Sequence, residues 1–120
     1  MQFVLLIHQG TTPTPTTADW SLLSAEEQQA VYADYAALNE TPGVSPGLPL
    51  GLPDQATTVR VVDGVPTVTA GPYVGDPTKA VGGYVLLEAD DPAAAIELAA
   101  RIPAARLGGG IEIRQVATYW

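Results

Sequence analysis

The chain contains no cysteine, a single histidine (His8) and a single lysine (Lys79) among its 120 residues. Without cysteine it can form no disulfide bond, no thiolate nucleophile and no thiolate metal site. Zinc sites draw on several histidines, cysteines or converging carboxylates, so one histidine alone argues against a metal site. We therefore expect no metal ion and no cofactor. The absence of cysteine is also compatible with the cytoplasmic location that we expect.

No apolar stretch approaches the roughly 20 residues of a membrane-spanning helix, so we expect no membrane span. Apolar residues 3–7 follow Met1-Gln2 directly, without the basic segment and cleavage site of a signal peptide, and we interpret them as the first strand. Positive charge is scarce as well: 5 Lys and Arg residues against 13 Asp and Glu residues give a formal net charge of −8. This charge repels phosphate backbones and anionic lipids, so we expect binding neither to nucleic acid nor to membranes.

Two segments carry helix signals. Residues 24–27, Ser-Ala-Glu-Glu, form a capping box, which predicts a helix that begins at Ala25 and ends at Thr41-Pro42-Gly43. Asp91 followed by proline is typical of a helix N-terminus and predicts a second helix over 92 to about 102. Ile96 and Leu98-Ala99 supply most of the apolar surface of this second helix.

Strand signals occupy most of the remaining chain. Asp63-Gly64 is a strong two-residue hairpin turn. Residues 44–53 contain three prolines between alternating leucines, which favours an interrupted edge strand. The other predicted strands are 3–7, 57–62, 65–70, 84–87 and 111–116. This order predicts a ferredoxin-like α+β sandwich with one antiparallel sheet and both helices on one face. The uncovered face then needs a partner, so we expect a homodimer that stacks two sheets.

Residues 70–73 (Ala-Gly-Pro-Tyr), Lys79 and residues 82–84 (Gly-Gly-Tyr) resemble the signature of the YCII-related, DGPF-type family of small bacterial proteins. That signature reads Asp-Gly-Pro-Phe, a short polar segment with a lysine, then Gly-Gly-Tyr and an apolar strand. The resemblance runs from Met1 to about Val116 and implies one domain over residues 1–120 that pairs as a dimeric α+β barrel. The signature aspartate is replaced by Ala70, so whatever that carboxylate does elsewhere is missing here.

His8 is the candidate general acid or base, because only an imidazole has an unperturbed pKa near neutrality. A hydrogen-bonded or partly exposed histidine at a strand end is the alternative. The resemblance implies a His–Asp pair, and the candidate carboxylates are Asp76, Asp34 and Asp19. We prefer Asp76, which lies in the signature segment, although an aspartate before Pro77 is also typical of a plain turn.

Lys79 is the candidate substrate-binding cation, since an ammonium in an acidic protein can anchor a carboxylate. An exposed loop lysine is the alternative. Tyr73 and Tyr84 flank this segment and are candidates for the wall of the same pocket, or else core residues. A serine triad is not indicated, because no serine lies in a nucleophile-elbow sequence.

Two functions follow as hypotheses. The first is a cofactor-independent pocket in which His8, Asp76 and Lys79 perform acid–base chemistry on a small organic metabolite, an inference by fold analogy. The second is a non-catalytic ligand-binding or accessory protein. For this second function, the family resemblance implies an association with extracytoplasmic-function sigma factor systems.

Overall fold

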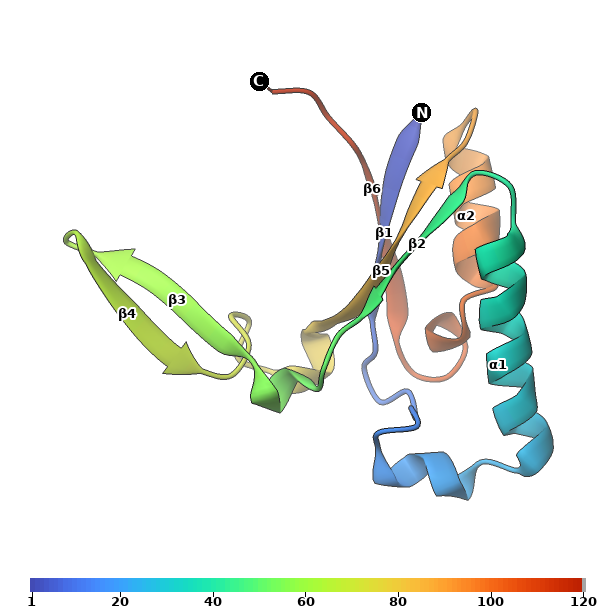
Figure 1. Cartoon of the computed structure of the whole chain (residues 1–120), viewed down its shortest axis with the longest axis horizontal. Coiled ribbons are helices and arrows are strands. Elements are labelled where there is room, and N and C mark those ends of the chain that lie inside the picture. Colours follow the sequence, from blue (N-terminus) through green and yellow to red (C-terminus); the bar gives the residue numbers. More distant parts are fainter. Residues whose placement is uncertain (120) are drawn as a thin grey trace.

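The structure, a computed structural model, describes residues 1–119. Its main body is a four-stranded antiparallel sheet, called the main sheet below, with two helices on one face (Figure 1). The strands are β1 (Gln2–His8), β2 (Val44–Pro49), β5 (Val81–Glu88) and β6 (Gly110–Gln115), and the helices are α1 (Ala25–Glu40) and α2 (Pro92–Ala100). Within the described residues, no helix is both long enough and apolar enough to span a bilayer.

The order of the main sheet is β2-β5-β1-β6. If the four strands are numbered 1 to 4 along the chain, they lie side by side in the order 2-3-1-4. With one helix after the first strand and one after the third, this is the ferredoxin-like arrangement of the α+β class. The predicted fold class is confirmed.

The helix starts are the predicted ones. The Ser24 hydroxyl accepts a hydrogen bond from the Glu27 amide at 3.1 Å, and an Asp91 carboxylate oxygen accepts from the Ala94 amide at 3.0 Å. Helix α2 ends at Ala100, two residues earlier than predicted. The expectation for Ile96 was wrong: its side chain is 62% exposed, whereas Leu98 is buried. Buried positions 95, 98 and 99 share one face of α2, and position 96 lies about 100° away from 95 around the helix axis.

The hydrophobic core lies between the main sheet and the helices. Alternate residues of β1 and β5 point into it, because successive side chains of a strand lie on opposite faces. The buried members of this set are Phe3, Leu5, Ile7, Val85 and Leu87, which cluster with Leu38, Leu98 and Ile102 from the helical side. The intervening residues of β1, Val4 and Leu6, lie on the opposite face of the sheet, called the open face below, and are only partly buried.

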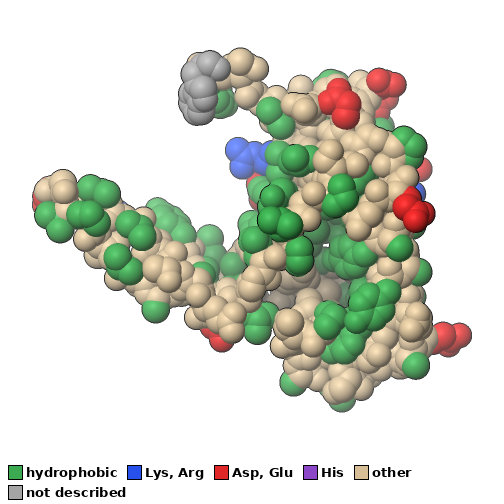
Figure 2. Space-filling view, viewed as in Figure 1, with side chains coloured by type: hydrophobic (Ala, Val, Ile, Leu, Met, Phe, Trp, Pro, Cys, Tyr) green, Lys and Arg blue, Asp and Glu red, His purple; other side chains and the backbone are tan. Residues whose placement is uncertain are grey.

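The predicted hairpin is present, as β3 (Thr57–Val62) and β4 (Val65–Ala70), but it does not join the main sheet as the sequence reading expected. It forms a two-stranded sheet of its own and projects from the body as an arm (residues 57–70; Figures 1 and 2). The radius of gyration is 16.1 Å, whereas a compact domain of this length has roughly 14 Å. Strand β2 pairs irregularly with β5, and its prolines, Pro46 and Pro49, have no N–H to donate to a further strand.

Leu5→Ala is expected to lower the free energy of unfolding by about 2–5 kcal/mol, because truncating a large buried side chain leaves a cavity. Leu5 is completely buried in the core. Urea denaturation followed by circular dichroism at a fixed protein concentration measures the change. The control is Leu22→Ala, at a side chain that is 82% exposed, where we expect a change within about 0.5 kcal/mol. Equal losses in the two variants would contradict this description of the core.

Candidate functional site

A cavity of about 540 Å³ lies where the ends of β1 and β5 meet the root of the arm. This volume is within the range of about 300–1,000 Å³ that is usual for small-molecule sites. Its wall is mainly apolar, with Leu50, Leu52, Pro53, Pro72 and Val74 among the lining residues. Charged or polar side chains come from His8, Gln55 and Lys79. An apolar wall with a few polar groups suits a small organic ligand better than a highly charged one.

His8 is the last residue of β1. Because side chains alternate along the strand, the His8 side chain lies on the open face, as that of Leu6 does. Its Nδ1 lies 3.0 Å from the backbone carbonyl oxygen of Lys79. A carbonyl oxygen only accepts hydrogen bonds, so this contact requires the ring proton to be on Nδ1. The bond links the end of β1 to the 3₁₀ turn Pro77–Lys79. A bulge accompanies it: Ile7 pairs with Gly83 and His8 with Val81, which leaves Gly82 as the extra residue of β5.

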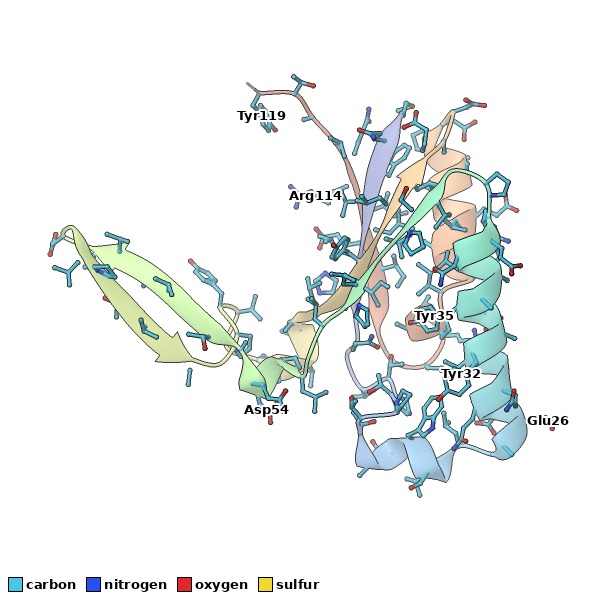
Figure 3. All side chains as sticks on the ribbon, in the orientation of Figure 1. Glu26, Tyr32, Tyr35, Asp54, Arg114 and Tyr119 are labelled. Carbon is cyan, nitrogen blue, oxygen red and sulfur yellow. The ribbon has the colours of Figure 1, made fainter. Side chains whose placement is uncertain are left out.

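The carboxylate beside His8 belongs to Glu112, a residue that the sequence reading did not single out. Glu112 Oε1 lies 3.4 Å from His8 Nε2, and Glu112 Oε2 accepts a bond from Arg114 Nη1 at 3.3 Å. Arg114 projects from β6 on the side of the sheet opposite the helices (Figure 3). The signal for Glu112 was its place between Ile111 and Ile113: in the fourth strand of this fold, which lies beside the first, that alternation turns Glu112 to the open face.

The contact between His8 and Glu112 is not a hydrogen bond. The geometry at Nε2 is unfavourable, and this buried atom has no hydrogen-bond partner within residues 1–119. With Nδ1 protonated, a neutral ring presents a lone pair at Nε2 to a carboxylate that also only accepts. A proton taken up at Nε2 would turn this acceptor–acceptor contact into an ion pair.

The aspartate that we preferred, Asp76, binds within its own turn. Its Oδ1 accepts from the Thr78 hydroxyl at 2.7 Å and from the Thr78 amide at 3.0 Å. These two hydrogen bonds, the hydroxyl first, hold the pKa of Asp76 below its ordinary value. Of the other candidate carboxylates, Asp34 pairs with Arg106 at 2.8 Å, and Asp19 lies in the 3₁₀ turn Ala18–Leu22. The structure thus brings none of the three aspartates into a hydrogen bond with His8 in the part of the chain that it describes.

Lys79 and Tyr73 line the same cavity as His8. The Lys79 ammonium group forms no salt bridge in the described part of the chain, although its charge contributes to the lowered pKa of Asp76. Tyr73 is 76% exposed at the cavity mouth. Tyr84 lies elsewhere, in a smaller cavity of about 310 Å³ that borders β2, where its ring occupies the space that a side chain at Gly47 would need. Of the five candidate residues, the structure brings three together: His8, Lys79 and Tyr73.

Thr78→Val is expected to raise the pKa of Asp76 toward that of an ordinary carboxyl group, because it removes the stronger of the two hydrogen bonds. The pKa of Asp76 is lower in the folded than in the unfolded state. The bonds therefore add stability above the unfolded-state pKa, and this contribution is lost as the pH falls through the folded-state pKa. An NMR titration of the side-chain carboxyl carbon measures the shift. Thr69→Val, on the arm, is the control, and an unchanged Asp76 titration in Thr78→Val would contradict the assignment.

Comparison with known proteins places this geometry in a family. A search of curated proteins finds no match. The family model of the YCII-related domain, in contrast, matches residues 1–119, so that it spans the main sheet, both helices, the arm and the cavity. The chain therefore belongs to the YCII-related domain family.

Proposed function

We propose that the cavity binds a small organic acid with an apolar body and that His8 exchanges a proton with it, without a cofactor. The observation that carries this proposal is the composition of the cavity wall: an ammonium group that forms no salt bridge within residues 1–119 and an imidazole of fixed tautomer, both in mainly apolar surroundings. An ammonium in such surroundings is a favourable partner for a carboxylate, because the apolar wall strengthens the attraction. Tyr73, at the mouth, is placed to cover the apolar part of the ligand.

In this proposal Glu112, rather than Asp76, complements His8. The Lys79 carbonyl holds the Nδ1 proton, so proton transfer takes place at Nε2. Nε2 is shielded from solvent, although the His8 side chain is 27% exposed. Access therefore requires neighbouring side chains to move, first of all Glu112, which is 47% exposed on β6. Once Nε2 has taken up a proton, the Glu112 carboxylate stabilises the resulting imidazolium. Asp76 acts indirectly, by holding the turn that carries Lys79.

Binding without catalysis is the second candidate function, and the shielded position of Nε2 favours it. In that case His8 ties β1 to the turn at Lys79, and the protein serves as a ligand-binding or accessory component, as in sigma factor systems. The two candidates share the anion site at Lys79 and differ only in whether His8 exchanges protons with the ligand.

We also propose that the protein is a homodimer that pairs through the open face. Val4 and Leu6 on β1 lie opposite Leu86 and Tyr84 on β5. These four side chains form an apolar patch that no helix covers, and Leu86 is 42% exposed. An apolar sheet face of this kind is typical of a protein–protein contact.

Lys79→Met is expected to weaken the binding of small monocarboxylates by about tenfold or more, because a charge-assisted hydrogen bond is lost. Isothermal titration with benzoate and hexanoate as probes measures it. Lys79→Arg keeps the charge and should restore most of the affinity. The matched control is Arg101→Met, at the C-cap of α2. It changes the net charge by the same amount at a residue that does not line the cavity, and should alter the affinity by less than about threefold. Equal weakening in Arg101→Met, or no binding by the wild type, would contradict the anion site.

His8→Gln is expected to slow proton exchange at C3 of a bound 2-oxo acid, the carbon next to the ketone, by about 10²–10⁴-fold, the usual contribution of a general acid or base. Proton NMR in deuterium oxide follows the exchange, and titration of the same variant should show nearly unchanged affinity. If the wild type binds the acid but does not accelerate exchange, the catalytic proposal is overturned and binding alone remains.

A further inference from the structure

The arm is amphipathic, and its apolar face is uncovered. Val59 lies directly opposite Val68, and Val61 lies opposite Pro66, so these four residues share one face of the hairpin. The three valines are 60–67% exposed. The other face carries Thr58, Arg60, Thr67 and Thr69, with Val62 and Val65 at the tip. A two-stranded hairpin alone is at best marginally stable in water, so its apolar face is expected to pack against another surface.

The acidic excess of the chain does not extend to the arm or to the adjoining open face. The charged residues between 57 and 79 are Arg60, Asp63, Asp76 and Lys79, and β6 adds Glu112 and Arg114. These are three acidic and three basic residues. The rest of the chain then holds 13 − 3 = 10 acidic and 5 − 3 = 2 basic residues, which accounts for the whole net charge of −8. Glu88, at the far end of β5, is neutralised by the N-terminal ammonium group at 3.1 Å.

This distribution of charge favours contact between two copies of the chain through the arm and the open face. Two molecules that each carry a charge of −8 repel one another over most of their surfaces. The arm and the open face are the places where they can meet without that repulsion. The arm rises beside the open face, so that both border one concave side of the molecule (Figures 1 and 2). One chain thus supplies a projecting apolar ribbon and, next to it, an uncovered apolar sheet. A two-fold axis can place each ribbon on the sheet of the other molecule.

We propose that the arm binds a second copy of this chain, with the face of Val59, Val61 and Val68 packed on the open face of that copy. The inference rests on the homodimer proposed above and adds the segment that makes the contact. It also connects assembly with the cavity, because Ala56, Pro72 and Tyr73 at the root of the arm belong to the cavity wall. Docking of the arm fixes the position of that wall.

The test compares two double variants of the full-length protein that differ only in the face of the hairpin that they change. Val59→Thr with Val68→Thr alters the apolar face, and Val62→Thr with Val65→Thr is the matched control on the opposite face. Threonine keeps the β-branched shape, so the hairpin itself should persist. Sedimentation velocity over a range of concentrations gives the dimer dissociation constant. We expect it to rise by about tenfold or more in the first variant, because buried methyl groups are replaced by hydroxyls, and to change little in the control.

The possible outcomes are distinct. A wild type that stays monomeric at every concentration overturns both the homodimer and the role of the arm. A wild-type dimer whose dissociation constant responds equally to the two variants, or to neither, overturns the role of the arm alone. Hydrogen exchange gives a second readout in the wild type: amides of β3 and β4 should become more protected as the protein concentration is raised. Protection that does not depend on concentration would contradict the proposal.

Discussion

The structure depends on a sheet that is covered by helices on one face only. Alternation along β1 and β5 sends one set of apolar side chains into the helical core and the other set to the open face. The two helices pack on the same side because each forms a right-handed crossover between two parallel strands of the sheet, α1 from β1 to β2 and α2 from β5 to β6 (Figure 1). This arrangement accounts for the position of His8 and Glu112 on the open face and for the uncovered apolar patch there.

The prediction from sequence succeeded where the pattern was local. The helix caps at Ser24 and Asp91 and the turn at Asp63-Gly64 are each specified by two to four neighbouring residues, and each was placed correctly. Asp63 and Gly64 both adopt positive φ, as such a turn requires. The arm was missed as a separate unit because strand signals do not say which strands pair. Whether β3 and β4 join the main sheet depends on which strand edges are free to pair with them, and the tertiary arrangement decides that.

In the candidate site too, residues close together in sequence could be predicted, whereas a residue brought there by the strand order could not. Lys79 and Tyr73 belong to one signature segment, so that sequence proximity was enough to bring them to one cavity. The carboxylate beside His8 comes from β6, more than 100 residues along the chain, and only the strand order places it there. Asp76 was preferred because it lies in the signature segment, yet its carboxylate accepts both of its hydrogen bonds from Thr78, two residues along the chain. Aspartate side chains often form hydrogen bonds with residues next to them in sequence. A carboxylate in a family signature segment therefore need not lie beside the catalytic side chain.

In the proposed dimer, the arm of one molecule covers the uncovered apolar sheet of the other. Isotope-filtered nuclear Overhauser spectroscopy on a mixed dimer, with one copy labelled and one unlabelled, tests it most directly. If the arm packs on the open face of the partner, we expect intermolecular contacts between methyl groups of Val59 or Val68 in one copy and those of Leu6 or Leu86 in the other. A dimer that shows no such contacts, with these arm methyl groups exposed to solvent, would contradict it.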